Sequence, residues 1–407
     1  MNSKFICRAC AALALASVLA NASWAATYKK LYNFTGGTDG GDPATPLIFD
    51  SAGNAYGTTA AGGDFGFGTV FMLTPSGQET VLYSFTGAGD GLDPHGGVTL
   101  DSAGNLYGTT VAGGFGGICA GDGCGVVFEL TPSGGSWTET TLYSFHGLND
   151  GFGPGGGLVF DTARNLFGTT PDGGAHSAGV VFELSPTKHG WQYKVIHAFT
   201  GGKDGAVGSL GLLLFDAAGN LYGVTELGGA NGAGVVYKLS PLPHGGWKTT
   251  VLYDFKGMPD AANPYGGLIF DALGNLYGTT YFGGATGMGA VFQLIPGPNG
   301  MWQENVLYSF QGGTDGSLPT TTLVFNAAGS LYGTTSTGGR PSCDCGTVFK
   351  LTLSRGSWVE KIVHLFGKGR DGSSPNYGLT LDQAGNLYGT TPVGGTGGQG
   401  IVFQLTP

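Results

Sequence analysis

Charged residues are scarce in this sequence. Asp, Glu, Lys and Arg make up 11% of the 407 residues, against about 25% in an average protein. Only 17 of these side chains are basic while 27 are acidic, which gives a net charge of -10. A nucleic-acid partner requires a basic surface that displaces counterions from the phosphates. The composition therefore argues against binding of DNA or RNA.

Long apolar runs are also lacking. Beyond the N-terminus no run approaches the ~20 residues that a membrane-spanning helix needs, so no transmembrane segment is expected. At the N-terminus, Lys4 and Arg8 precede a short apolar stretch, Ala9 to Ala20, and small residues follow at the two positions that a signal peptidase reads. This pattern predicts a secretory signal peptide over residues 1–25. The mature chain is expected to be secreted, periplasmic or extracellular, and monomeric.

Cysteine is rare, with six in the whole sequence. Two of them fall within the predicted signal peptide, and the other four form two close pairs, Cys119 with Cys124 and Cys343 with Cys345. In an oxidising export compartment such neighbours are expected to form local disulfides.

Glycine, by contrast, is abundant, with 82 residues. Glycine destabilises a helix interior by roughly 1 kcal/mol relative to alanine, which disfavours a helical fold. Hydrophobic residues still make up 41% of the chain and aromatic residues 12%, enough for a packed core rather than a disordered chain. Collagen is excluded because the glycines have no three-residue period. An all-β protein rich in turns is favoured.

A tetrad, Tyr-Gly-Thr-Thr or a close variant, recurs seven times at intervals of 51 to 60 residues. The copies begin at Tyr56, Tyr107, Phe167, Tyr222, Tyr277, Tyr332 and Tyr388. Each copy contains four strand-length segments rich in β-branched or aromatic residues. In the fifth copy these segments are 268–271, 276–280, 290–294 and one that ends at Phe310. Because short Asp- and Gly-containing loops connect them, each copy predicts a four-stranded antiparallel sheet.

The two ends of the chain complement each other. Residues Thr27 to Phe34 have the pattern of a fourth strand without the first three, and Ile401 to Leu405 that of a third strand without a fourth. If the N-terminal strand completes the C-terminal sheet, the ring closes and no sheet edge is left without its strand. The sequence therefore predicts one domain over residues 26–407, a seven-bladed β-propeller made of seven repeats of about 55 residues.

The repeated strings are Leu-Tyr-Ser-Phe, Gly-x-x-Asp-Gly, Phe-Asp-x-Ala-Gly-Asn-Leu-Tyr-Gly-Thr-Thr and Gly-Val-Val-Phe-x-Leu, and they extend over residues 31–407. In these strings the chain resembles the GloVer (Gloeo-Verruco) extracellular tandem repeat of bacteria. Members of that family are called choice-of-anchor proteins because they end in varied sorting or anchoring tails. The resemblance implies an extracellular location and a repeat architecture, and it implies no particular activity. Because this sequence stops at its final strand, surface anchoring is not expected.

If the first strand of each blade is innermost, the second-to-third-strand loops and the crossings between blades share one face. Each crossing carries an Asp at the equivalent position. These residues are Asp39, Asp90, Asp150, Asp204, Asp260, Asp315 and Asp371. A ring of carboxylates would attract Ca²⁺ or a cationic ligand. Capping of each glycine-rich turn by its own Asp is favoured instead, because a structural role explains sevenfold repetition; no cofactor is expected, with Ca²⁺ as the alternative.

Positions that differ between copies are better candidates for a binding site. The residues directly after the crossing proline, which the fourth copy lacks, should rim the central channel. They are Ala44, His95, Gly155, Tyr265, Thr320 and Asn376. Among them His95, Tyr265 and Asn376, together with the adjacent Tyr377, can hydrogen-bond or stack on a sugar or peptide. Ordinary variation of a surface loop is the competing explanation.

Two functions of different classes fit these features. The favoured one is a secreted, non-catalytic protein that binds an extracellular glycan, peptide or protein on the loop-rich face. The alternative is an enzyme of the lyase or lactonase type with a divalent cation at the channel mouth, which rests on analogy of fold alone. An enzyme should bring polar residues from several blades together at one end of the channel, with a perturbed carboxylate or histidine. No catalytic residue or metal ligand is identified, and a structural envelope protein is a third possibility.

Overall fold

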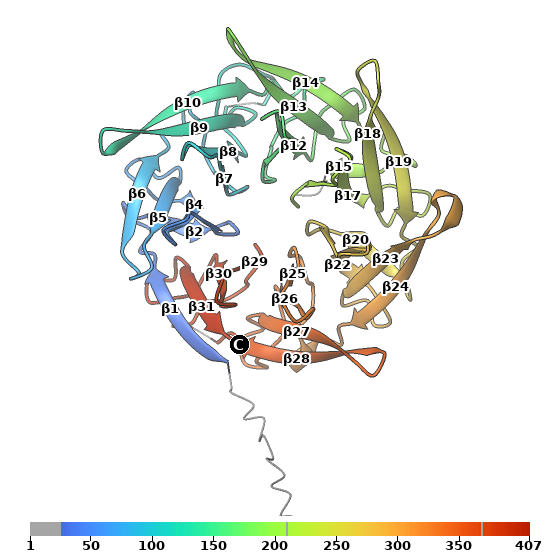
Figure 1. The fold of residues 1–407 in the computed structure, drawn as a ribbon. Helices are drawn as coiled ribbons and strands as arrows, with labels where there is room; N and C mark the ends of the chain where they lie inside the picture. Colours follow the sequence, from blue (N-terminus) through green and yellow to red (C-terminus); the bar gives the residue numbers. More distant parts are fainter. Residues whose placement is uncertain (1–25, 120, 209–210, 368) are drawn as a thin grey trace, which may run out of the picture.

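A computed structural model of the chain describes residues 26–119, 121–208, 211–367 and 369–407. Seven β-sheets surround a central axis as the blades of a propeller (Figure 1). Within the described residues the only helical elements are two 3₁₀ turns, Pro298–Gly300 and Gly313–Asp315. The predicted seven-bladed β-propeller is confirmed. The predicted signal peptide lies outside the described residues.

The blades are numbered here along the chain, each from its inner to its outer strand. Blade 1 contains β2 (Gly41–Pro43), β3 (Ile48–Phe49), β4 (Ala55–Ala61), β5 (Thr69–Leu73) and β6 (Glu79–Ser84). Blade 2 contains β7 (Val98–Leu100), β8 (Leu106–Thr110), β9 (Val126–Ser133) and β10 (Ser136–Ser144). Blade 3 contains β11 (Val159–Phe160), β12 (Leu166–Thr170), β13 (Val180–Thr187) and β14 (Gly190–Ala198). Blade 4 contains β15 (Ala206–Gly208), β16 (Leu214–Phe215), β17 (Leu221–Leu227), β18 (Val235–Pro241) and β19 (Trp247–Asp254). Blade 5 contains β20 (Ala261–Pro264), β21 (Ile269–Phe270), β22 (Leu276–Gly283), β23 (Ala290–Pro296) and β24 (Trp302–Ser309). Blade 6 contains β25 (Val324–Phe325), β26 (Leu331–Thr335), β27 (Thr347–Ser354) and β28 (Ser357–Leu365). Blade 7 contains β29 (Leu379–Leu381), β30 (Leu387–Thr391), β31 (Ile401–Thr406) and β1 (Thr27–Asn33).

Blade 7 joins the two ends of the chain. Strand β1 pairs antiparallel with β31, with Thr27 opposite Thr406 and Asn33 opposite Ile401. In Figure 1 the blue N-terminal strand accordingly lies beside the red C-terminal strands. The predicted closure is confirmed, and it gives the last blade its outer strand.

The tetrad glycine is explained by packing within a blade. In blade 5 a Cβ atom on Gly278 would lie 2.6 Å from Cζ of Phe292, which belongs to the neighbouring strand β23. Phe292 is fully buried, so the ring has no room to yield and the position requires glycine. The same contact recurs at each tetrad, which is why the glycine recurs with it.

Aromatic residues that follow the outer strands hold neighbouring blades together. Phe255, directly after β19, lies edge-to-face with Phe292 of the next blade at a centroid distance of 5.1 Å. Phe310 makes the same contact with Phe349 at 5.1 Å, and Phe34 with Phe71 at 5.1 Å. All of these rings are fully buried. Each of these Phe side chains therefore enters the core of the next blade, and its burial stabilises the contact between the two blades.

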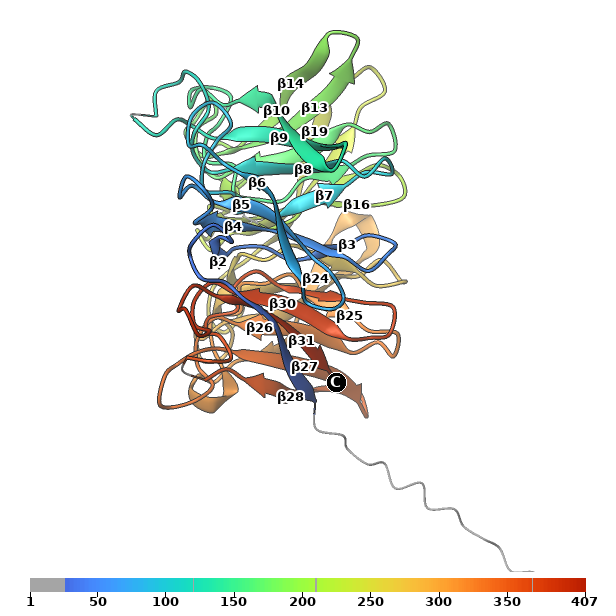
Figure 2. The ribbon, with the colours of Figure 1, turned by 90° about the vertical axis from the view of Figure 1, so that its left-hand side faces the viewer.

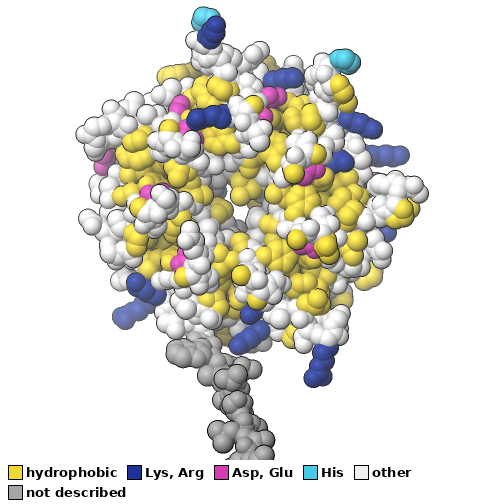
Figure 3. Space-filling view, in the orientation of Figure 1, with side chains coloured by type: hydrophobic (Ala, Val, Ile, Leu, Met, Phe, Trp, Pro, Cys, Tyr) yellow, Lys and Arg dark blue, Asp and Glu magenta, His cyan; other side chains and the backbone are white. Residues whose placement is uncertain are grey.

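The two faces of the disc differ in their loops. The short turns between the first two strands of a blade lie on one face, and the crossings and second-to-third-strand loops lie on the other, as the edge-on view shows (Figure 2). In Figure 3 the face with the short turns points to the viewer, and hydrophobic side chains gather around its hollowed centre. The face opposite to it is the loop-rich face. This arrangement is the one expected from the sequence.

Candidate ligand site at the loop-rich mouth of the channel

A cavity of about 510 Å³ occupies the central channel. Residues of every blade line it, and most of them come from the crossings. Three others, Glu226, Tyr281 and Ser336, directly follow the tetrads of β17, β22 and β26. The cavity therefore lies at the loop-rich end of the channel, and its volume is within the range of roughly 300–1,000 Å³ typical of small-molecule sites.

The structure brings the predicted binding residues together in this lining. They are His95, Tyr265, Asn376 and Tyr377. Of the other positions expected at the rim, Gly155 and Thr320 also line the cavity. Ala44 does not, because it is fully buried; blade 1 contributes Pro46 instead.

Backbone contacts between neighbouring crossings set the width of the channel. A Cβ atom on Gly266 would lie 2.5 Å from the carbonyl carbon of Thr321 in the next blade. A Cβ atom on Gly211 would lie 2.5 Å from the amide nitrogen of Gly267. Only glycine allows such approaches. The chemistry of the cavity is therefore determined by the few lining residues that have large side chains.

One side of the mouth is built around His95. Its Nε2 lies 2.9 Å from Oδ1 of Asp93, and its ring lies edge-to-face with Tyr377 at a centroid distance of 5.9 Å. Burial opposes protonation of His95, but the hydrogen bond to Asp93 and the charges of Asp93 and Asp42 outweigh it and raise the histidine pKa. Burial, and then repulsion from Asp93, raises the pKa of Asp42, although His95 opposes the shift. A histidine thus lies between two carboxylates here.

The other side is built from Glu226, Tyr265 and Tyr281. The rings of Tyr265 and Tyr281 lie 6.3 Å apart between centroids and are inclined by 43°. Burial raises the pKa of Glu226. Burial, and then the charges of Glu226 and Tyr281, raises the pKa of Tyr265. This side is therefore an aromatic wall beside a partly desolvated carboxyl group.

Tyr377 and Asn376 connect the two sides. Burial is the main cause that raises the pKa of Tyr377, and the charges of Asp42, Tyr265 and Asp93 add to it in that order. The phenol of Tyr377 is therefore close to ionisable groups of both sides. The side-chain oxygen of Asn376 is buried and has no hydrogen-bond partner among the described residues. The Thr320 hydroxyl donates to the backbone oxygen of Asn376 at 3.3 Å.

The lining contains one carboxylate, Glu226, and one histidine, His95, and it contains neither Lys nor Arg among the described residues. Sequence reasoning did not find Glu226 or Tyr281. Both occupy the position directly after the tetrad, where the other copies have small or proline residues: Ala60, Val111, Pro171, Ser336 and Pro392. This departure from the repeat is the signal that could have identified them.

The seven crossing Asp residues are engaged elsewhere. Each accepts a hydrogen bond from the backbone N–H four residues earlier, at distances between 2.6 and 3.1 Å. In five of them the carboxylate also accepts from a Tyr hydroxyl, and in the other two it lies near His197 or His364. None of them lines the cavity. These are the bonds of the turn-capping role, and within the described residues no group of three or more His, Cys, Asp and Glu is arranged to hold a metal ion.

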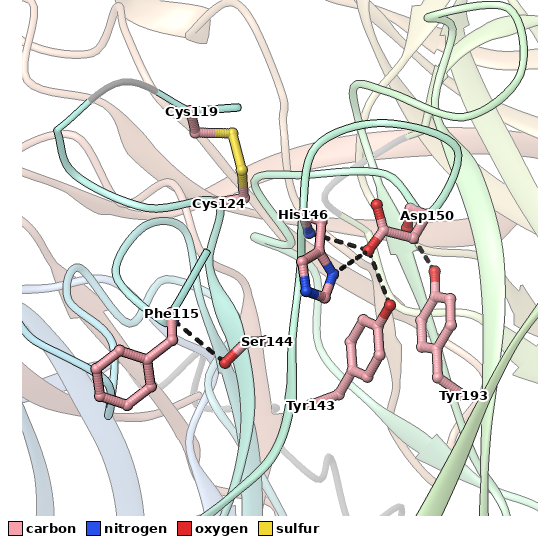
Figure 4. A network of polar contacts seen from close by, with 8 residues as sticks. All are labelled: Phe115, Cys119, Cys124, Tyr143, Ser144, His146, Asp150 and Tyr193. Carbon is pink, nitrogen blue, oxygen red and sulfur yellow. Dashed lines mark hydrogen bonds and ion pairs between the residues drawn. A yellow bond between two sulfur atoms is a disulfide. The ribbon is translucent and has the colours of Figure 1, made fainter. Parts of the chain in front are cut away.

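Figure 4 shows one of these turns together with a disulfide. Asp150 accepts from the Tyr143 hydroxyl at 2.8 Å and lies 3.1 Å from Nδ1 of His146. The nearby loop between β8 and β9 is bridged by Cys119 and Cys124. Cys343 and Cys345 are bonded in the corresponding loop of blade 6. Neither disulfide lines the cavity, so both stabilise loops at a distance from it.

In the part of the chain that the structure describes, no helix has the length and apolar character to cross a membrane.

Comparison with known proteins relates the chain to one repeat. The family model described as the Gloeobacter/Verrucomicrobia repeat matches residues 18–120, 115–343 and 211–407. No curated protein matches the chain.

Among solved structures, the chain is similar to the extracellular domain of a proposed one-component system from B. thetaiotaomicron, with a TM-score of 0.53 and 9% identity. That match covers 92% of this chain and 39% of the other, so this chain spans about two fifths of its length. A proposed oxidoreductase (glucose dehydrogenase) from Thermus thermophilus aligns with a TM-score of 0.44 and 16% identity, covering 82% of this chain and 98% of that one. At these identities the likeness concerns the fold alone.

Proposed function

This chain belongs to the Gloeobacter/Verrucomicrobia repeat family, and we propose that it is a secreted, non-catalytic propeller that binds an extracellular ligand in the cavity at the loop-rich mouth of its channel. One observation carries the proposal. The residues that break the sevenfold repeat, His95, Tyr265 and Tyr377 among them, converge on a single cavity although they come from different blades. Repeated residues build the fold, so residues that differ and meet in a concave site are candidates for ligand recognition.

The shape of the site favours a glycan or another small ligand over a folded protein partner. A stable protein interface is a broad surface of about 800 Å² on each partner, whereas this site is concave and its volume of about 510 Å³ lies in the range of roughly 300–1,000 Å³ of small-molecule sites. Its lining combines aromatic rings with a carboxylate and several hydroxyl groups. Such a mixture suits a sugar ring, which presents both apolar faces and hydroxyl groups.

Export is part of the proposal. It is supported by the pattern of Lys4, Arg8 and the apolar stretch that follows, and by two disulfides, which persist in oxidising compartments. Protein recovered from the periplasm or medium is expected to begin at Ala26. Recovery of uncleaved protein from the cytoplasm would contradict export.

Binding is tested with a glycan array, followed by calorimetric titration of the best glycan. Tyr281→Ala, which alters the cavity, is expected to weaken binding at least about tenfold, equivalent to about 1.4 kcal/mol. Phe282→Ala is the matched control, since Phe282 is adjacent, 46% exposed and outside the lining. A larger loss in the control than in Tyr281→Ala, or no selected glycan on the array, would overturn the proposal.

A catalytic function is the second candidate, because His95, Asp42 and Tyr377 come from three blades and have raised pKa values, and Asp93 lies 2.9 Å from the His95 ring. This is the arrangement expected of an enzyme. Incubation of the selected glycan with the protein distinguishes the two functions. Shortened or unsaturated products that disappear in His95→Gln would establish catalysis and overturn the non-catalytic proposal; an unchanged glycan supports it.

A further inference from the structure

We propose that the ligand of this cavity carries a protonated amine, as an amino sugar does, and that Glu226, Tyr265 and Tyr281 form the subsite for that amine. The inference rests on the proposed function of the cavity and deepens it by naming the ligand class. It also assigns a role to Glu226 and Tyr281, which break the repeat at the same position in neighbouring blades.

The charge of the site favours a cation. Glu226 is the carboxylate of the lining, and Asp42 and Asp93 lie close behind His95. The lining has no Lys or Arg among the described residues. Its one basic side chain, His95, is already paired with Asp93 at 2.9 Å. An anionic ligand such as a uronic acid would find no free cation here, whereas an ammonium group would find a carboxylate.

The geometry beside Glu226 suits an ammonium group. The rings of Tyr265 and Tyr281 lie 6.3 Å apart and are inclined by 43°. A cation within about 6 Å of an aromatic ring centroid is attracted by the negative face of the ring, and more strongly where water is displaced. Glu226 lies close enough to Tyr265 for its charge to raise the tyrosine pKa. The carboxylate and the two rings therefore border the same part of the cavity.

The side chain of Glu226 forms no hydrogen bond or ion pair with the part of the chain that the structure describes, unlike a structural carboxylate. Burial is the only cause that raises its pKa, with no charged or hydrogen-bonding neighbour among the described residues that lowers it. The turn carboxylate of Asp271, by contrast, accepts four hydrogen bonds. A bound ammonium group would compensate the desolvation of Glu226 and hold it in its ionised form.

The wall beside this subsite suits the remainder of a sugar. Blade 6 contributes hydroxyl side chains to the lining, namely Thr320, Thr321, Thr322 and Ser336. Blade 7 adds Asn376, whose buried side-chain oxygen has no partner among the described residues. Because hydroxyl and amide groups hydrogen-bond to sugar hydroxyls, an amino sugar uses both walls, whereas a lysine side chain would use only the wall that contains Glu226.

The experiment compares glucosamine with glucose by calorimetric titration of the mature protein at pH 6. The two sugars differ only in an amine or a hydroxyl at one carbon. Glucosamine is expected to bind at least about tenfold more tightly, and this preference should weaken with added salt. Glu226→Gln should remove the preference. Glu183→Gln is the matched control, because Glu183 lies on β13 outside the cavity and bonds Ser185; it should leave the preference unchanged.

Further arms separate the possible failures. Thermal melting of each variant shows whether it folds as the wild type does, so that loss of binding is not loss of structure. Nα-acetyl-lysine amide, whose side-chain amine is free, tests a peptide amine. Tighter binding of this probe than of glucosamine would overturn the assignment to an amino sugar. If glucose and glucosamine bind equally and Tyr281→Ala weakens both, the cavity binds neutral sugars, so the inference fails while the proposed function stands. If none of the three probes binds and the glycan array is also empty, both fail.

Discussion

At the scale of single residues, the carboxylate at the turn between the first two strands is a clear structural element. Asp271 accepts bonds from the backbone N–H groups of Leu273 and Asn275, from the Asn275 side chain and from the Tyr277 hydroxyl, all between 2.7 and 3.0 Å. Burial opposes ionisation of Asp271, but these four hydrogen bonds outweigh it and lower its pKa. In blade 6 the residue is Asn326, which keeps both backbone bonds, to Ala328 and Ser330.

Replacement of this residue should show a graded cost. Asp271→Ala is expected to lower the free energy of unfolding by about 2 kcal/mol, because two backbone N–H groups and a tyrosine hydroxyl lose their acceptor. Asp271→Asn should cost clearly less, since Asn326 serves the same turn in blade 6. Chemical denaturation at pH 7 measures both. Because the folded pKa is lowered, the contribution of Asp271 is present at neutral pH and is lost as the pH falls below the ordinary range of Asp.

Equal losses for Asp271→Ala and Asp271→Asn would contradict this account, since they would mean that the charge rather than the turn bonds matters.

The candidate site illustrates what single residues reveal in a repeated sequence. His95, Tyr265, Asn376 and Tyr377 could be predicted because they follow a recognisable proline. Glu226 departs from the repeat at the position after the tetrad, which marks it as unusual, but the sequence of its own segment does not indicate that it faces the channel. Its position depends on how the blades are arranged around the axis, which is a property of tertiary structure.

At the scale of elements, the outer strands bring carboxyl groups to the interfaces between blades. In four blades the residue six positions before the Phe that directly follows the outer strand is a glutamate near a crossing Asp. The glutamates are Glu79, Glu139, Glu304 and Glu360. Burial is the main cause that raises their pKa values, and the neighbouring Asp adds to it; the values are about 7 for three of them and about 8 for Glu304. In the other blades the position is held by Tyr28, Tyr193 and Thr249.

These glutamates predict that stability falls as the pH rises. A folded pKa above the ordinary value of 4.5 means that folding favours the protonated form. The contribution is therefore fully present below about pH 4.5 and is lost as the pH rises through about 7 to 8. We expect a lower melting temperature at pH 8 than at pH 5, with a loss of the order of 1 kcal/mol per carboxyl, because these side chains keep some contact with solvent.

The variant with all four glutamates changed to Gln should lose most of this pH dependence and melt at a higher temperature than the wild type at pH 8. A variant with Glu183→Gln serves as control, since Glu183 lies on a third strand, whereas the four glutamates lie on outer strands. A quadruple variant with an unchanged pH profile would show that these groups are solvated as in the unfolded chain.

At the scale of the whole molecule, stability depends on closure of the ring. Strand β1 supplies the outer strand of blade 7, and Phe34, which follows it, is fully buried against Phe71 of blade 1. The first residues of the mature chain therefore hold its last residues and also the first blade. Propeller stability is distributed over similar interfaces, so one open interface affects the cooperativity of the whole.

Deletion of residues 27–34 should abolish a single sharp unfolding transition. The deletion removes the partner of β31 and leaves a hydrophobic core exposed at one interface. Differential scanning calorimetry is expected to show a broad or split transition at a lower temperature. The protein without residues 1–25 is the control and should melt sharply. A chain without 27–34 that unfolds as cooperatively as the control would rule out closure as the source of stability.

Much of this architecture could be predicted because the same strand and turn pattern recurs along the sequence. Seven copies of one pattern, together with ends that complement each other, define the number of blades and the closure. The division of the inner strand could not be foreseen. In blades 1, 4 and 5 the crossing pairs with the second strand as a short strand, β2, β15 or β20, and in the other four blades it makes a single bridge, such as that between Leu92 and Ala112. Whether the contact is a short strand or a single bridge is a property of tertiary structure, which local propensity does not determine.

The glycine contacts around the axis mean that the cavity is preorganised. Since backbone touches backbone at positions such as Gly211 and Gly266, the aperture has a diameter that rotamer changes cannot alter. A ligand therefore meets a rigid frame and loses little affinity to reorganisation of its host. Substitution at the few large side chains of the lining would change what is bound while the dimensions of the opening stay the same.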